Sequence, residues 1–218
     1  MRRAFAPAIL VLCLCSSAGA GDFAFSGFDL DNDGWMVGEF LPPAPIPVAP
    51  VHQSPGGYVE TADIDIGNWT GYIAPAKFLG NWVQAHVHDI TFDTRIQESD
   101  GVPYVYLVVE GGGLRISPFG APPVDNVWTS YVFHTLSAAG WVYTNDGITP
   151  GGPVSPADFI AVMSNVTAFR ISSDWHTGPD LVDLDNVRLV ASPEPGTLGL
   201  IATGLAALPV LLRRRRRA

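Results

Sequence analysis

The sequence predicts an all-β protein, an antiparallel β-sandwich with a single short helix. Short runs in which apolar and polar residues alternate recur along the chain, which is the pattern of strands with one buried face. Residues that favour turns separate these runs, and the chain holds 23 glycines and 19 prolines. The part between the two chain ends, about 170 residues, suits one domain with a real hydrophobic core.

Eight segments carry the strand pattern. In one of them the apolar positions change phase between Val87 and Ile90, which indicates a β-bulge near His88 or Asp89. The segments expected to form strands are residues 23–28, 59–66, 83–94, 102–110, 113–117, 128–136, 168–173 and 184–190.

Two segments depart from this pattern. Residues 41–55 contain six prolines, and because proline lacks the N–H that a ladder needs, we expect an exposed loop there. Ser155 can cap a helix that starts with proline and carries an acid in its first turn, and apolar residues follow at helical spacing. A short helix is therefore expected over residues 156–164.

The first 20 residues are typical of a secretory signal peptide. Two arginines precede an apolar run, and a small-x-small cleavage site follows. Cys13 and Cys15 lie in this segment, so the mature chain is expected to have neither disulfides nor thiolate chemistry. The sequence thus predicts a signal peptide over residues 1–20 and one domain over residues 21–191.

The C-terminal segment, residues 192–218, has three parts in a fixed order. Pro193-Glu194-Pro195 comes first, an apolar run over residues 198–212 follows, and five arginines come next. This tail resembles the PEP-CTERM sorting signal, which implies export, processing by an exosortase and transient anchoring in the inner membrane. The alternative is an ordinary C-terminal membrane anchor, although the run is shorter than the roughly 20 residues that span a bilayer. We expect a protein of the cell surface or the extracellular space.

The charge of the expected domain excludes one class of partner. Residues 21–191 hold five basic and 20 acidic side chains, a formal net charge of −15. So acidic a surface repels nucleic acid, whose binding needs Lys and Arg to neutralise phosphates. It suits a soluble extracellular protein, a cation binder, or both.

The middle of the chain carries the most specific motif, WTGYIAPAKFLGN over residues 69–81. This motif resembles the laminin B (laminin IV type A) domain. The resemblance covers residues 23–190 and implies a jelly-roll β-sandwich, in agreement with the strand pattern. The chain departs from the family by its proline-rich insertion and by its lack of cysteines and of flanking EGF-like repeats. Other segments that match the family are residues 90–94, 104–109, 159–166 and 184–189.

A calcium site is one interpretation of the first acidic turn. Asp29, Asp31 and Asp33 alternate and a glycine follows, which is how a calcium loop begins. The twelfth loop position is Phe40 and not a glutamate, so a complete EF-hand is excluded. In related jelly rolls an acid on the last strand joins such an ion, which implies Asp185 as a further ligand of a structural Ca²⁺. The alternative is an Asx-rich turn ahead of a buried tryptophan.

No constellation for catalysis stands out. The chain has no nucleophile-elbow motif, and Gly111–Gly113 lies between two expected strands, which indicates a turn and not a phosphate cradle. His86 and His88 lie two residues apart on an expected strand and could chelate a transition metal, but no third ligand is evident nearby. Paired carboxylates for glycoside cleavage stay open, because an acidic chain supplies many by chance. We expect no enzyme and assign no catalytic residue.

Aromatic residues are candidates for a sugar-binding face. Sugar faces stack on exposed rings, but aromatic rings also fill sandwich cores, where we expect Trp35, Trp69 and Trp128. The candidates for an exposed platform are Tyr72, Trp82, Trp141, Tyr143 and Trp175.

The expected function is that of an exported, non-catalytic adhesion module that interacts with exopolysaccharide or with other surface proteins. The alternatives are a glycan-active hydrolase that uses a carboxylate pair and a structural matrix protein with no small ligand. A patch of aromatic rings on one sheet face would favour binding. Two carboxylates about 5 to 10 Å apart in a cleft would favour hydrolysis.

Overall fold

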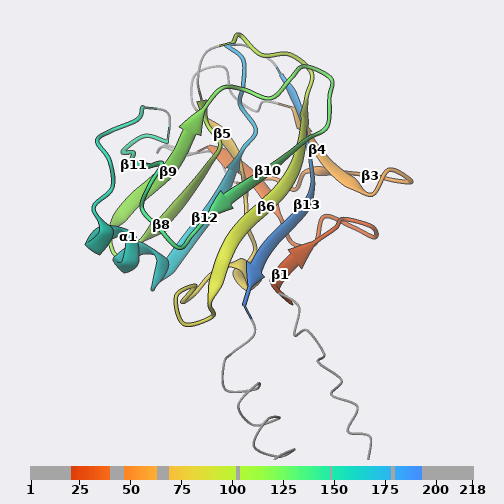
Figure 1. The fold of residues 1–218 in the computed structure, drawn as a ribbon. Coiled ribbons are helices and arrows are strands. Elements are labelled where there is room, and N and C mark those ends of the chain that lie inside the picture. The colour runs from red at the N-terminus through yellow and green to blue at the C-terminus, as the bar shows by residue number, and fades with distance from the viewer. Residues whose placement is uncertain are drawn as a thin grey trace, which may run out of the picture. The chain divides into compact units, whose positions relative to one another are not determined.

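Two antiparallel sheets pack against each other across a large apolar core in the computed structural model (Figure 1). The expected antiparallel sandwich is therefore confirmed. The expected signal peptide and the sorting tail from Pro193 onward lie outside the described residues. The structure describes residues 21–39, 47–62, 69–101, 104–147, 149–177 and 180–192.

The first sheet is built around β13, which has neighbours along both sides. One side pairs with β6, while β4 and β1 pair with the two halves of the other side. Across this sheet the strands are β10 (Thr129–His134), β6 (Val87–Ile96), β13 (Leu181–Ala191), β4 (Tyr58–Ala62) and β3 (Val51–Gln53), with β1 (Gly21–Ser26) also paired to β13.

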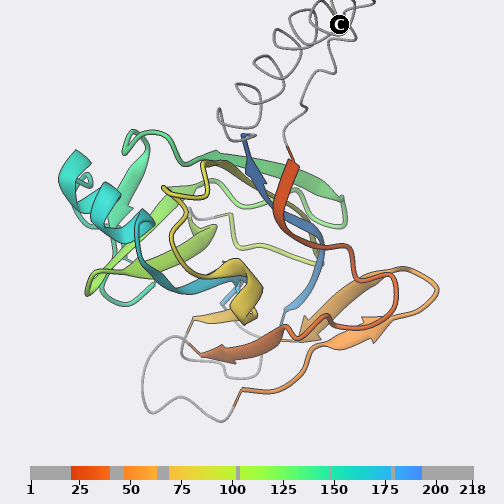
Figure 2. The same cartoon turned by 90° about the horizontal axis from the view of Figure 1, so that it is seen from below.

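The second sheet lies behind the first and carries the helix at one margin. Figure 2 shows α1 (Pro156–Met163) at one side of the sandwich and the β3–β4 hairpin at the opposite side. The strands of this sheet are β11 (Trp141–Tyr143), β9 (Leu114–Gly120), β8 (Leu107–Gly111), β12 (Val166–Ser172), β5 (Thr70–Ile73) and β2 (Met36–Glu39), with β7 (Tyr104–Val105) paired to β9 and a 3₁₀ turn η1 (Ala76–Phe78) after β5.

Phe169 on β12 is the centre of an aromatic cluster between the sheets. Its ring centroid lies 6.2 Å from those of Trp35 and Phe78 and 5.7 Å from that of Trp82. The two indole N–H groups are satisfied, since Trp35 donates to Ser26 Oγ and Trp82 to the carbonyl of Phe78, each at 2.9 Å. The APAKFLGN segment thus supplies Phe78, a ring of the core.

The expected helix is confirmed, and it ends at Met163, one residue before the predicted end. The Ser155 side chain accepts the N–H of Asp158, and proline occupies the first turn. Phe159, Val162 and Met163 are buried in the core. Ser164 is the C-cap, where the helical backbone ends.

The bulge expected near His88 is also confirmed. Val190 pairs with Asp89 but the next residue, Ala191, pairs with Val87, so His88 is the extra residue. The start of the strand was predicted too early, because residues 83–86 form a turn and β6 begins at Val87.

The proline-rich segment is only partly the loop that we expected. Val48 forms a bridge with Val37, and residues 51–53 form β3. Because β3 is an edge strand, it tolerates nearby prolines that a central strand would not. Residues 40–46 lie outside the described part of the chain. The sequence also missed β2, β5 and β11, which are too short to show a clear alternation.

Candidate binding face

The outer face of the first sheet carries a row of side chains that crosses four strands. Backbone pairing sets Arg95 of β6, Asp183 of β13 and Glu60 of β4 opposite one another. Trp128 precedes β10 and continues the row on the other side of Arg95, since β10 pairs with β6 in the same register. We call Trp128, Arg95, Asp183, Glu60 and the adjacent Tyr58 the binding row.

An ion pair lies in the middle of the binding row. Arg95 Nε donates to Asp183 Oδ2 at 2.6 Å, and Nη2 donates to the hydroxyl of Tyr58 at 3.4 Å. The guanidinium carbon lies 5.1 Å from the ring centroid of Trp128 and 5.4 Å from that of Tyr58. The two rings meet edge to face at 5.5 Å. The Arg95 cation therefore contacts both rings and favours their edge-to-face arrangement on the sheet face.

Burial and hydrogen bonding shift the pKa values of both members of this ion pair. Burial raises the pKa of Asp183, whose side chain is 6% exposed, and the hydrogen bond from Arg95 opposes this rise without cancelling it. The charge of Glu60 adds to the rise. The hydrogen bond to Asp183 in turn raises the pKa of Arg95. The guanidinium thus stays charged and compensates a carboxylate that has lost most of its water.

A neighbouring row on the same face is acidic. Asp93 of β6 and Asp185 of β13 pair in register, and Asn186 Nδ2 donates to these two carboxylates at 2.9 and 3.2 Å. Burial raises the pKa of Asp185 to about 6, and the charges of Asp93 and Asp29 contribute to the rise. Sequence reasoning did not single out Asp93, because its proximity to Asp185 depends on strand pairing.

The acids of the expected calcium loop have separate surroundings. Asp33 forms an ion pair with Lys77, and Asp31 accepts the N–H of Asp33 at 2.7 Å, as in an Asx turn. Asp29 instead contributes to the raised pKa of Asp185. Within the described ranges no three His, Cys, Asp or Glu side chains form a group that could hold a metal ion. Calcium binding by these three acids and Asp185 stays a prediction.

The aromatic platform predicted from the sequence is wrong in its members. Four of the five rings are 0 to 3% exposed and lie in the core; two of them are on strands, and the other two are in the turn before β6 and in the segment after β12. The fifth, Tyr143, is half-buried and its hydroxyl donates to Asp158 at 2.6 Å. The buried rings are Tyr72, Trp82, Trp141 and Trp175.

Trp128 is a second correction. We expected it in the core with Trp35 and Trp69, which are indeed buried, but Trp128 is 39% exposed. The alternation along β10 could have shown this, because Trp128 shares its parity with the exposed Val132. Tyr58 of β4, which no sequence pattern singled out, is the partner ring of Trp128.

The histidines do not form the chelating pair that the sequence suggested. His86 is an exposed turn residue with φ of +54°, before β6 begins, so it does not share a strand face with His88. His88 Nδ1 lies 2.9 Å from one oxygen of Asp89, and His134 Nδ1 of β10 lies 2.6 Å from the other. Two imidazoles therefore flank one carboxylate.

A known family model matches most of this β-sandwich domain. Residues 71–204 match the family model described as Laminin B (Domain IV). The chain belongs to the laminin B family. The match confirms the resemblance seen in the APAKFLGN segment, and the two-sheet architecture agrees with it.

The laminin B domain of this chain is similar to parts of animal laminin subunits. It is 27% identical over 176 residues to laminin subunit gamma-2 of Homo sapiens, an alignment that covers 77% of this chain and 13% of that protein. It is 31% identical over 109 residues to laminin subunit gamma-1 of Xenopus tropicalis, which covers 48% and 6%. The chain thus spans only a small fraction of the length of these relatives.

A solved structure shows the same fold. The L4b domain of human laminin alpha-2 superposes with a TM-score of 0.62 at 12% sequence identity, over 78% of this chain and 98% of that domain. At this level of identity the likeness concerns the arrangement of the strands.

The C-terminal segment matches a second family model. Residues 193–217 match the PEP-CTERM protein-sorting motif, which confirms the interpretation of the tail. The motif and the laminin-like domain together indicate an exported, surface-associated protein. No helix within the described ranges combines the length and the apolar character that crossing a membrane requires.

Proposed function

We propose that this chain is an exported, non-catalytic surface module whose laminin B domain binds exopolysaccharide through the binding row. The group formed by Tyr58, Arg95 and Trp128 carries the proposal. An exposed indole beside a second ring offers a surface on which a sugar face can stack. The half-buried guanidinium of Arg95 and carboxylate of Glu60 in the same row offer hydrogen bonds to hydroxyl groups.

The charge of the domain indicates which polysaccharides fit. With a formal net charge of −15 over residues 21–191, the domain repels polyanions at low ionic strength. The neighbouring acidic row adds to this repulsion, because Asp93 and Asp185 lie on the same sheet face as Arg95. We therefore expect a neutral polysaccharide and not an acidic one.

Affinity electrophoresis in native gels tests this proposal. The protein is run through plain gels, gels with a soluble neutral β-glucan and gels with alginate. We expect retardation by the glucan alone, and its loss in Trp128→Ala. Phe23→Ala is the matched control, since Phe23 is an exposed aromatic residue of the same sheet, 41% against 39% exposed. Equal migration in all gels, or unchanged retardation of Trp128→Ala, would contradict the proposal.

One observation favours a second candidate, a glycan hydrolase. A carboxyl with a pKa of about 6 beside another carboxylate, as in Asp185 and Asp93, is an arrangement that general acid catalysis can use. Asn186 bridges the two acids, which equally explains them as a structural network. Reducing ends released from β-glucan by the wild type and not by Asp185→Asn would support hydrolysis. No release by the wild type would exclude it for this substrate.

A further inference from the structure

One end of the sandwich exposes aliphatic side chains from three separate segments, and we call it the α1 end. Val83 in the turn before β6, Leu136 after β10 and Ile160 on α1 are 47, 77 and 55% exposed. The helix already buries its other face in the core, so an apolar outer face leaves it without a partner. Its outward positions are Pro156, Ala157, Ile160 and Ala161.

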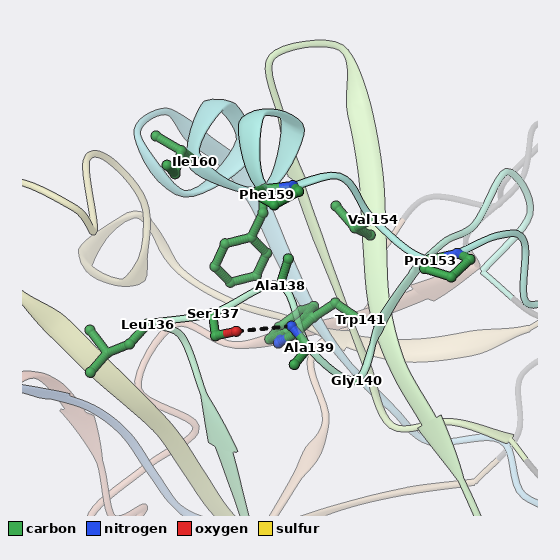
Figure 3. A pocket seen from close by; sticks show the side chains of 11 residues that line it. Leu136, Ser137, Ala138, Ala139, Gly140, Trp141, Pro153, Val154, Phe159 and Ile160 are labelled. Atoms are coloured by element: carbon green, nitrogen blue, oxygen red, sulfur yellow. Dashed lines mark hydrogen bonds between the residues drawn. The ribbon is translucent and has the colours of Figure 1, made fainter.

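Two hollows adjoin at this end. The first has a volume of about 440 Å³, and Figure 3 shows Phe159 pointing from the helix toward Ala138, with Leu136 at the edge. The second has a volume of about 320 Å³ and is lined by Ser192 among others. Leu136, Phe159 and Ile160 line both hollows, so the two hollows together extend from the helix to Ser192, which follows β13.

The α1 end is nearly free of charge in a strongly acidic domain. Residues 82–86, 135–141 and 153–165 contain one Asp, Glu, Lys or Arg, namely Asp158. Its carboxylate accepts a hydrogen bond from the hydroxyl of Tyr143 at 2.6 Å, so it belongs to the contact between the helix and β11. This surface therefore suits an apolar partner far better than a charged polymer.

The chain leaves the domain at the α1 end. Ser192 donates its N–H to the carbonyl of His86 at 3.0 Å, which fixes the exit point beside the second hollow. The apolar run of the sorting motif starts six residues later, at Leu198. Six residues span at most about 20 Å when fully extended. A run inserted in a membrane would therefore hold the exit point within that distance of the bilayer.

We propose that the α1 end rests on a phospholipid bilayer while the tail is anchored, with Leu136 and Ile160 in the headgroup region. This inference rests on the anchoring that the sorting motif implies, and not on glycan binding. The short tether, the exposed aliphatic residues and the near absence of charge favour a lipid surface over a second copy of the chain. The acidity of the rest of the domain favours zwitterionic lipid over anionic lipid.

Fluorescence quenching by labelled lipid tests the proposal on the chain from Gly21 to Ala218, which has no cysteine of its own. An environment-sensitive fluorophore is attached to Ala161→Cys on α1 or to Ala121→Cys, an exposed position after the far end of β9. Each protein is reconstituted in phosphatidylcholine vesicles that contain nitroxide-labelled phosphatidylcholine. We expect a blue-shifted emission and strong quenching for Ala161→Cys, and neither for Ala121→Cys.

Further outcomes separate this proposal from the others. Adding Leu136→Ser and Ile160→Ser to Ala161→Cys should reduce its quenching while the protein still floats with the vesicles. Flotation with equal quenching at the two positions would overturn the contact and leave the anchoring intact. A blue shift without lipid quenching would identify another occupant, such as a second copy, and would also overturn it. Retardation by β-glucan is measured separately and is expected to be unchanged by the two serine substitutions.

Discussion

Replacing Arg95 by methionine leaves the Asp183 carboxylate buried without its cation. Asp183 is 6% exposed, whereas Arg95 is 35% exposed, so the penalty falls mainly on the acid. Removing one partner of a buried pair typically costs 3–5 kcal/mol. Because water reaches the arginine side of this pair, we expect the lower end, about 3 kcal/mol of unfolding free energy at pH 7.

Urea unfolding at several pH values measures this cost. Burial raises the pKa of Asp183 in the folded state, and loss of Arg95 should raise it further. A raised carboxyl pKa gives stability that is present at acid pH and lost as the pH rises, so the deficit of Arg95→Met should shrink toward pH 4. Arg95→Met combined with Asp183→Asn should recover most of the loss.

The surface ion pair of Arg115 and Glu110 is a control for the substitution of Arg95. Arg115 Nε lies 3.3 Å from Glu110 Oε2, and the Arg115 side chain is 37% exposed. Arg115→Met should therefore lower the free energy of unfolding by less than about 1 kcal/mol. If Arg95→Met were no more destabilising than Arg115→Met, or if its deficit were independent of pH, the ion pair would not stabilise the binding row as described.

Three further predictions concern the acidic row and the helix. Asp185→Asn should stabilise the protein by roughly 1–2 kcal/mol at pH 7 and not at pH 4. The raised pKa of Asp185 means that the folded state penalises the charged carboxylate, which is populated only above that pKa, and solvent screening reduces the penalty. Urea midpoints at the two pH values test this. Calcium binding by Asp29, Asp31, Asp33 and Asp185 predicts that millimolar calcium raises the thermal midpoint of the wild type and not that of Asp185→Asn; equal midpoints of the wild type in calcium and in chelator would refute it. Gly111→Ala should destabilise the protein by about 1–3 kcal/mol, since a Cβ there would lie 2.5 Å from the carbonyl oxygen of Val162. Gly152→Ala is the control, because a Cβ at residue 152 would have no heavy atom within 4 Å. Similar melting temperatures of the two variants would contradict the close packing of the helix against β8.

The sequence predicted the fold class and most of the elements well, because strands, helix and bulge leave local patterns. Alternation and turn residues indicated the sandwich, Ser155 indicated the helix, and the phase change near His88 indicated the bulge. These signals lie within one segment each and do not require knowledge of which strands pair. Strands of three or four residues, such as β2 and β11, carry too little pattern to be found this way.

The candidate site was much harder to predict, because it depends on pairing between distant segments. Tyr58, Arg95 and Trp128 meet only through the order of β4, β13, β6 and β10. Composition could not tell which rings face outward, and four of the five rings that were chosen for a platform are in the core. The parity of Trp128 along β10 was the one signal available, and it required the strand boundary to be known.

Intrinsic tryptophan fluorescence tests glycan binding at the binding row most directly. Of the six tryptophans in the chain, Trp128 is 39% exposed and the other five are at most 3% exposed, so acrylamide quenches mainly Trp128. Titration with soluble neutral β-glucan should shift the emission to shorter wavelength and protect it from acrylamide. Trp128→Phe should abolish both effects. An unchanged emission while the glucan retards the protein, or the same change in Trp128→Phe, would contradict a binding site at this row.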